Sequence, residues 1–335
     1  MQLTKNARFK LIQLTDEINS LKAVKDKILN NKRQELLDLK DLPNGMSDDE
    51  KYYNSWWESS DQKANVVNLH LGKTGNCKAT GIQYLKATPI CEYATRRRKN
   101  KSGEILPKEK RLNTESFDVI FVCQNKVVYM ITFTTEHHPL LRIKRLIGEQ
   151  FISSETNIND LTPDLFHWLF FKYTNNKASL GNYINLENIV GFTGIVATND
   201  HIFEGKSDQT ADLIVTKAFI SSGYSIKSIK IKLHSGNGIL TFFVNENDDL
   251  SVERGSNIDL PLQSSEEDIA IPIFLYFIVL PELNRLYQAE SESFIGTEKL
   301  KFNEEIGKMV IISIAKKNDI DLQTLSESAD RAIAT

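Results

Sequence analysis

Cationic side chains are concentrated in one short stretch of this sequence, residues 93–111, which reads YATRRRKNKSGEILPKEKR. Arginine suits phosphate recognition, because its planar guanidinium group can donate two hydrogen bonds at once. Eight cations oppose only two acids, Glu104 and Glu109, so the net charge of the stretch is +6. The cations of this stretch, named the basic segment here, are Arg96, Arg97, Arg98, Lys99, Lys101, Lys108, Lys110 and Arg111. The pattern predicts contact with nucleic-acid phosphates, with a solvated hairpin tip and an acidic protein partner as the alternatives.

A second group of cations is predicted on a strand, in the run SIKSIKIKLH. Side chains alternate between the two faces of a strand, so Lys230 and Lys232 share one face while isoleucines and a leucine fill the other. The run LLRIKRL adds Arg142, Lys144 and Arg145. Phosphate contacts need only such local clusters and no global positive charge. The alternative for Lys230 and Lys232 is an ordinary solvated sheet face.

The residue pattern gives little support for catalysis. A metal-dependent nuclease needs acidic groups that converge on a divalent ion, often beside a lysine. Asp118 could be the first acid and Glu136 the second, but the strand VVYMITF between them offers neither an acid nor a lysine. The sequence therefore predicts no catalytic residue, no metal and no cofactor, and a divergent nuclease using Asp118 and Glu136 remains an alternative.

Other motifs that bind metals or phosphates are incomplete. The run LGKTGN at residues 71–76 resembles the end of a phosphate-binding loop, but Val67 stands where the first glycine is required. The three cysteines are widely spaced and form no C-x-x-C pair, so neither a zinc ribbon nor a disulfide framework is supported, and a reducing cytoplasm is the simplest compartment. The adjacent His137 and His138 are expected on a strand, where they would point to opposite faces and could not easily bind one ion.

Composition indicates a soluble globular protein. Of 335 residues, 41% are hydrophobic and 25% charged, and the net charge is -3. Removing the +6 of the basic segment leaves -9 on the rest of the chain, so that segment stands out. The most apolar run, IAIPIFLYFIVLPEL, contains two prolines and is shorter than the roughly 20 residues that a membrane-spanning helix needs. It is therefore predicted to be a buried core segment.

The N-terminal segment, residues 7–40, is predicted to form one long helix or two joined helices. Its apolar residues recur at alternating spacings of three and four, which is the heptad pattern of a helix–helix seam. We expect a homodimer through this seam, or a helix that packs on its own domain. The seam residues are Leu11, Leu14, Ile18 and Leu21.

The periodicity of the remaining chain changes between strand and helix without a regular βαβ series, which predicts the α+β class. The predicted domains are an N-terminal helical segment at 1–45, a β-rich domain at 46–155 and a C-terminal α+β domain at 156–335. In the β-rich domain, a short aromatic helix is expected near residues 52–57. The basic segment is expected at the tip of a long β-hairpin, with Ser102 and Gly103 at the turn. In the last domain, a hairpin and C-terminal helices are expected.

Together these patterns predict a non-catalytic nucleic-acid-binding subunit of a larger cytoplasmic assembly. The binding mode is backbone contact without sequence specificity, because the basic segment has no aromatic residue except Tyr93. A chain rich in Asn, Lys and Ile is compatible with an accessory bacterial system such as phage defence or a mobile element. A dimeric protein-interaction scaffold without nucleic-acid binding is the first alternative.

Overall fold

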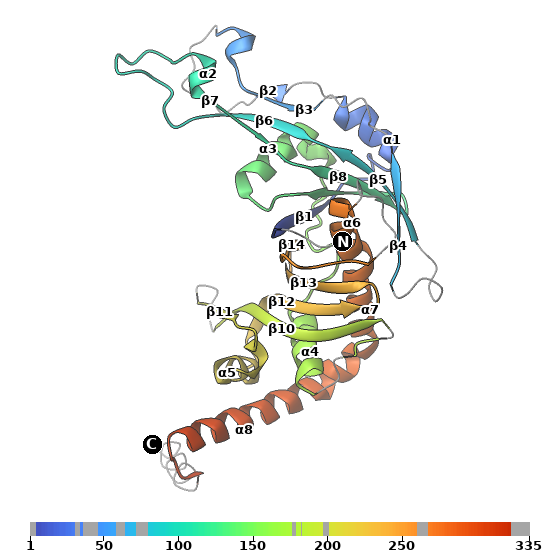
Figure 1. Cartoon of the computed structure of the whole chain (residues 1–335), viewed down its shortest axis with the longest axis vertical. Helices are drawn as coiled ribbons and strands as arrows, with labels where there is room; N and C mark the ends of the chain where they lie inside the picture. The colour runs from blue at the N-terminus through green and yellow to red at the C-terminus, as the bar shows by residue number, and fades with distance from the viewer. Residues whose placement is uncertain are drawn as a thin grey trace.

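The computed structural model describes residues 5–30, 34–35, 46–57, 64–71, 80–175, 179–181, 183–196, 201–259 and 267–322. Within them, ten strands form one antiparallel sheet (Figure 1). From one edge to the other they are β11 (Ile202–Lys206), β10 (Ile184–Ile195), β12 (Ser225–Ser235), β13 (Gly238–Asn245), β14 (Asp249–Val252), β1 (Ala7–Gln13), β9 (Val127–Thr132), β8 (Val119–Gln124), β5 (Thr80–Ala87) and β4 (Asn65–Leu69).

A smaller sheet and the helices complete the molecule, which curves into an arc (Figure 1). The four-stranded sheet runs in the order β2 (Gln34–Glu35), β3 (Tyr53–Trp56), β6 (Pro89–Ala94) and β7 (Leu112–Ser116). The helices are α1 (Leu21–Ala23), α2 (Lys108–Arg111), α3 (His137–Ile147), α4 (Pro163–Thr174), α5 (Ile214–Ser221), α6 (Glu267–Phe274), α7 (Leu280–Ser293) and α8 (Lys299–Lys317). The predicted α+β class is thus confirmed.

The C-terminal helices run on from one another, because π-helical turns at Leu275–Val279 and Phe294–Glu298 join α6, α7 and α8. By length and composition alone, Asp268–Lys317 could cross a membrane, but 67% of its most apolar window is buried inside the protein. The apolar run at the start of this span is therefore a core element, as the sequence predicted, and the burial is consistent with a soluble protein.

Two hydrophobic cores lie on opposite faces of the large sheet. In β8, Ile120 and Val122 join the core that includes α4, α6 and α7, whereas Val119 and Phe121 join the core beneath α3. Because side chains alternate along a strand, a strand covered on both faces is apolar at successive positions, as β8 is. The core beneath α3 also holds the smaller sheet through Trp56.

The predicted N-terminal helix is wrong. Residues Ala7–Gln13 form strand β1, and the helical part is limited to Leu21–Ala23 and a π-helical turn at Val24–Leu29. Residues 7–13 adopt a strand and not a helix because β1 pairs with β14 on one side and with β9 on the other. The proposed seam residues are each at most 5% exposed and belong to the protein's own core, so they form no helical seam: Leu11, Leu14, Ile18 and Leu21.

Two further sequence predictions concern the first half of the chain. The aromatic segment near 52–57 was predicted as a helix but forms strand β3, because Asn54 and its neighbours pair with β6 and β2. The large sheet contains strands from all three predicted domains, 1–45, 46–155 and 156–335, since β1 lies between β14 and β9. Those domain boundaries remain predictions.

Candidate nucleic-acid interface

The basic segment lies at the outer end of a long two-stranded ribbon that crosses both sheets. Strand β5 continues into β6 after Thr88, and β7 continues into β8, so the two halves of the ribbon pair along their length. Ala87 pairs with Val119 in the large sheet, and Ala94 pairs with Leu112 in the small one. The outer end, residues 95–111, projects away from the body of the protein (Figure 1). The predicted long hairpin is therefore present.

Local hydrogen bonds define the tip of this hairpin. The Asn100 side-chain oxygen accepts bonds from the backbone amides of Ser102 (2.9 Å) and Glu104 (3.0 Å), and its amide group donates to the Glu104 carboxylate (2.7 Å). Gly103 has a φ of 84°, a conformation that glycine adopts at no steric cost. One of the two acids in the basic segment is thus bound to Asn100 at the turn.

Arg111 anchors the base of the hairpin and is a buried residue with 0% exposure. Its Nη2 donates to the carboxylate and the backbone carbonyl of Glu50, both at 2.7 Å, and its Nε donates to the Leu106 carbonyl at 2.8 Å. The guanidinium also lies over the Tyr52 ring, 5.0 Å from the ring centre. Arg111 is therefore a structural residue in this fold and cannot contact a ligand without local unfolding.

A second set of contacts fixes the hairpin against α3. Arg142 of α3 forms an ion pair with Glu115 of β7 (2.8 Å), and its guanidinium stacks 3.9 Å from the centre of the Tyr93 ring. Lys108 pairs with Glu92 at 2.8 Å. These contacts occupy the only aromatic ring of the basic segment and one of its lysines. They place the hairpin firmly on the body of the protein.

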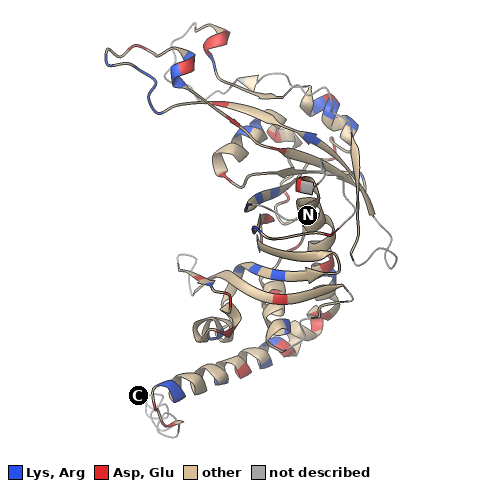
Figure 2. Ribbon diagram, viewed as in Figure 1, with Lys and Arg blue, Asp and Glu red and all other residues tan. Residues whose placement is uncertain are grey.

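The remaining cations of the hairpin are available to solvent. Two cations are half-buried, Arg98 and Lys108. Residues 95–111 are fully described, and five cations among them are exposed and form no ion pair with any other described residue. These five, named the free cations below, are Arg96, Arg97, Lys99, Lys101 and Lys110. Figure 2 shows the concentration of blue at the projecting hairpin. The structure thus divides the predicted site into exposed and structural members.

The second predicted cationic group, Lys230 and Lys232, lies on β12, and acidic side chains pair with both lysines. Lys230 and Lys232 do share the outward face of β12, as their spacing predicted, while Ile229 and Ile231 are buried. Lys230 pairs with Glu253, and Lys232 pairs with Glu187 at 2.7 Å. Strand β12 lies in the middle of the arc, well away from the projecting hairpin (Figure 1). The two groups therefore do not form one continuous surface.

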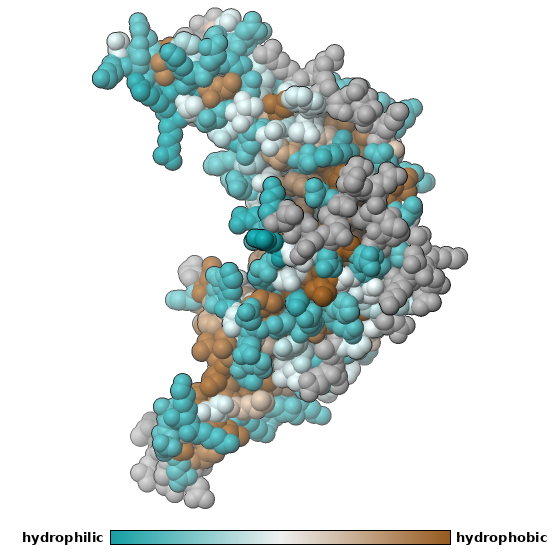
Figure 3. Space-filling model, in the orientation of Figure 1, coloured by the Kyte–Doolittle hydropathy of each residue, from teal (hydrophilic) through white to brown (hydrophobic). Residues whose placement is uncertain are grey.

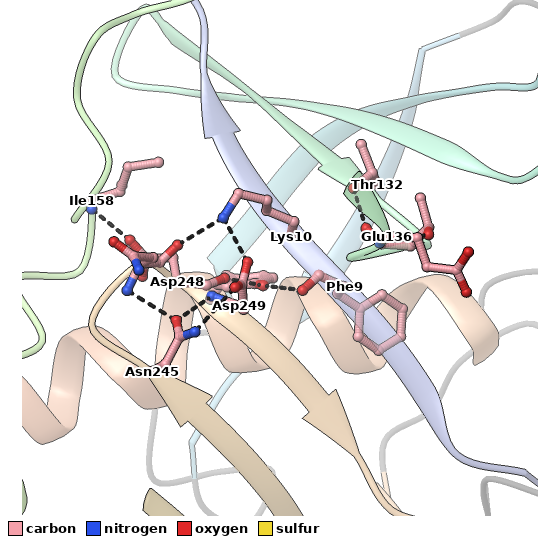
Figure 4. A network of polar contacts seen from close by, with 11 residues as sticks. Phe9, Lys10, Thr132, Glu136, Ile158, Asn245, Asp248 and Asp249 are labelled. Atoms are coloured by element: carbon pink, nitrogen blue, oxygen red, sulfur yellow. Dashed lines mark hydrogen bonds and ion pairs between the residues drawn. The ribbon is translucent and has the colours of Figure 1, made fainter. Parts of the chain in front are cut away.

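Acids balance cations over the rest of this sheet face. Lys10 pairs with Asp249 at 2.6 Å, and the Asn245 amide donates to the same carboxylate at 3.0 Å (Figure 4). The neighbouring Asp248 is buried, and burial raises the pKa of its carboxyl group, while the backbone amide of Ile158 donates to it at 2.6 Å. A cavity of about 380 Å³ on this face is lined by three cations and three acids: Arg8, Lys206, Lys230, Glu204, Asp249 and Glu253. The formal charges that line this cavity therefore cancel.

Of the two candidate nuclease residues, Asp118 is paired with other side chains and Glu136 is exposed to solvent. Asp118 forms an ion pair with Lys86 (2.7 Å) and accepts a hydrogen bond from the Thr88 hydroxyl (3.3 Å). Glu136 is exposed at the start of α3. His137 and His138, expected at the end of a strand, open that helix instead. No three His, Cys, Asp or Glu residues in the described part of the chain are grouped to hold a metal ion. The run LGKTGN lies almost entirely outside the described residues.

Sequence reasoning missed three residues that build the hairpin, Glu50, Asn100 and Glu115, and it assigned Arg142 to phosphate contact, whereas Arg142 pairs with Glu115 and stacks on Tyr93. Asn100 alone carried a readable signal, because Asn two residues before a Ser-Gly step commonly accepts backbone hydrogen bonds in a turn. Nothing local in the sequence pairs Arg111 with Glu50. No protein-family model matches this sequence, and no curated protein is significantly similar to it. The functional argument therefore rests on the geometry of the hairpin.

Proposed function

We propose that this protein binds nucleic acid through the projecting hairpin, with the free cations contacting phosphates. The observation that carries the proposal is the exposure of five unpaired cations on one rigidly anchored element. Like charges held close together repel one another, and phosphate groups would relieve that repulsion. Elsewhere on the sheet face, by contrast, Lys10, Lys230 and Lys232 already have acidic partners.

Backbone contact without base recognition is the mode that these residues favour. Arg142 covers one face of the Tyr93 ring, the one aromatic ring of the basic segment, and the free cations at the tip have no aromatic neighbour within residues 95–111 on which a base could stack. Cations on a hairpin tip can neutralise phosphates irrespective of the sequence that carries them. The proposal therefore predicts similar affinity for unrelated sequences.

The proposal retains a non-catalytic role in a larger cytoplasmic assembly, such as a bacterial defence system. Asp118, the better nuclease candidate, is supported as a structural residue by its contacts with Lys86 and Thr88. The anchoring of the hairpin by α3 supports a binding element of fixed shape. A fixed shape lowers the entropic cost of binding.

Fluorescence anisotropy with labelled duplex DNA, single-stranded DNA and RNA tests the proposal. The variant replaces four free cations with alanine: Arg96, Arg97, Lys99 and Lys101. We expect it to bind at least about tenfold more weakly than the wild type, with unchanged folding. The matched control removes four exposed lysines from other surfaces, Lys22, Lys27, Lys301 and Lys317, and should bind as the wild type does.

Three results would overturn the proposal. A wild-type protein that binds none of the three nucleic acids has a different ligand. Equal loss of affinity in the hairpin variant and the control would mean that binding follows net charge alone. Unchanged affinity in the hairpin variant would leave the hairpin as a solvated tip.

A further inference from the structure

Helix α8 has an apolar surface that its own protein does not cover. In its first part, Phe302 and Ile306 are buried against the core. Beyond them the helix continues to Lys317, near the tip of the arc opposite the hairpin (Figure 1). This outer half exposes large hydrophobic side chains: Met309, Ile311, Ile312 and Ile314. Figure 3 shows hydrophobic surface along this part of the molecule.

One face of α8 combines these residues with charges in a regular pattern. Glu305, Met309, Ile312 and Lys316 are spaced by four, three and four residues, which places them in one stripe along a helix. Met309 is 47% exposed and Ile312 is 41% exposed, while Glu305 and Lys316 at the two ends are also exposed. The stripe is therefore acidic at one end, apolar in the middle and basic at the other.

This order is self-complementary when two copies of the helix lie antiparallel. In such a pair a two-fold axis passes through the midpoint of the contact. A residue that precedes this midpoint on one copy then faces the residue that follows it by the same number of positions on the other copy. The midpoint between Glu305 and Lys316 falls between Val310 and Ile311, and so does the midpoint between Met309 and Ile312. A single register thus brings Glu305 of each copy to Lys316 of the other, and Met309 of each to Ile312.

We propose that α8 is a homodimer interface, in which two copies of this chain pair antiparallel through the Glu305–Lys316 stripe. The charge complementarity selects a second copy as the occupant, because both charged ends and both apolar positions match in the same register. The overlapping segment, residues 304–317, is about 21 Å long at roughly 1.5 Å per residue. Such an interface is small, so the dimer should be reversible in the micromolar range.

This interface is different from the N-terminal seam that the sequence indicated, whose residues are buried. It is also independent of the hairpin, which lies at the opposite end of the arc (Figure 1). The four-alanine hairpin variant should therefore dimerise as the wild type does, whether or not it binds nucleic acid. A failure of one proposal leaves the other intact.

A charge-reversal experiment tests both the interface and its register. Sedimentation equilibrium of nuclease-treated full-length protein should show dimers of twice the 38.1 kDa chain mass. Glu305→Lys alone and Lys316→Glu alone each place like charges together at both ends of the interface, and each should raise the dissociation constant on the order of tenfold or more. An equimolar mixture of the two single variants should recover dimers, because every facing pair is then again of opposite charge.

Glu292→Lys is the matched control, since it makes the same charge change at an exposed glutamate of α7, outside the overlapping segment, and it should dimerise as the wild type does. A wild type that remains monomeric at high concentration would overturn the proposal. Deleting residues 323–335 would then show whether the end of the chain occupies the stripe instead. Dimers that are insensitive to both single variants, or variants whose mixture stays monomeric, would also overturn it.

Discussion

Replacing Arg111 with alanine is the change that best separates the structural cations of the hairpin from the exposed ones. Arg111 and Arg97 belong to the same basic segment, and only the structure distinguishes their roles. Arg111 is fully buried, whereas Arg97 is exposed. Arg111→Ala should therefore destabilise the protein, while Arg97→Ala should leave its stability within about 0.5 kcal/mol of the wild type.

The size of the effect follows from the contacts of Arg111. Its side chain donates hydrogen bonds to three oxygen atoms, those of the Glu50 carboxylate, the Glu50 carbonyl and the Leu106 carbonyl. Breaking a buried ion pair by removing one partner costs about 3–5 kcal/mol. The Glu50 side chain is 43% exposed and can regain water, and the Arg111 Nη1 has no hydrogen-bond partner in the described structure. We therefore expect the lower end, about 3 kcal/mol.

Urea unfolding followed by tryptophan fluorescence measures this difference, because Trp56 of β3 lies in the smaller sheet that Arg111 supports. Arg111→Lys should recover only part of the loss, since an ammonium group cannot reproduce the forked contacts of a guanidinium. A loss below 1 kcal/mol for Arg111→Ala, or a loss equal to that of Arg97→Ala, would refute the assignment of Arg111 as a buried anchor.

Three further predictions concern the core and the absence of hydrolysis. Burial lowers the pKa of His167 to about 4. In the unfolded chain the same imidazole binds a proton below about pH 6.5, so the free energy of unfolding should fall by up to about 3 kcal/mol between pH 6.5 and 4. Urea titrations of His167→Gln should not show this pH-dependent decrease. The buried Tyr276 hydroxyl donates its single proton to the Asp248 carbonyl at 2.7 Å and also lies 3.1 Å from the Phe9 carbonyl. Tyr276→Phe should therefore lower the free energy of unfolding by about 1–2 kcal/mol, and an unchanged value would contradict that role. Purified protein should not cut plasmid DNA in the presence of magnesium or manganese. If the wild type does cut and Asp118→Ala does not, the nuclease alternative is the better account.

Local signals predicted the elements whose contacts are local. Thr162 caps α4 by accepting a hydrogen bond from the Leu165 amide, and Pro163 opens the helix, as their order in the sequence indicated. The β12–β13 hairpin also follows its sequence, because the alternating isoleucines and lysines of β12 lead into a turn at Gly236 and Asn237, after which the apolar run of β13 begins. In both cases, the residues that determine the structure lie within a few positions of one another.

Contacts between distant parts of the chain explain the errors. The run from Leu11 to Leu21 has helical spacing, but β1 becomes a strand because its partners lie near residues 130 and 250. In the aromatic segment, Tyr52, Asn54 and Trp56 are buried while the residues between them are partly exposed, which is the alternation of a strand. The sequence YYNSWW does not alternate between apolar and polar residues, so this strand is not readable from the sequence.

The candidate site was predictable in position but not in its division of roles. Eight cations around a Ser-Gly step located the hairpin correctly. Their separation into free cations and anchors depends on Glu50, 61 residues from Arg111 along the chain, and on Arg142 of α3. No pattern within residues 93–111 distinguishes Arg111 from Arg97.

The salt dependence of duplex DNA binding tests the central claim most directly. If each cation replaced in the four-alanine variant (Arg96, Arg97, Lys99 and Lys101) neutralises one phosphate in the wild type, the slope of log affinity against log salt should decrease in magnitude by about 0.9 per residue, or about 3.6 in total. The four-lysine control should keep the wild-type slope. A hairpin variant with the wild-type slope would contradict the claim that these cations contact phosphates.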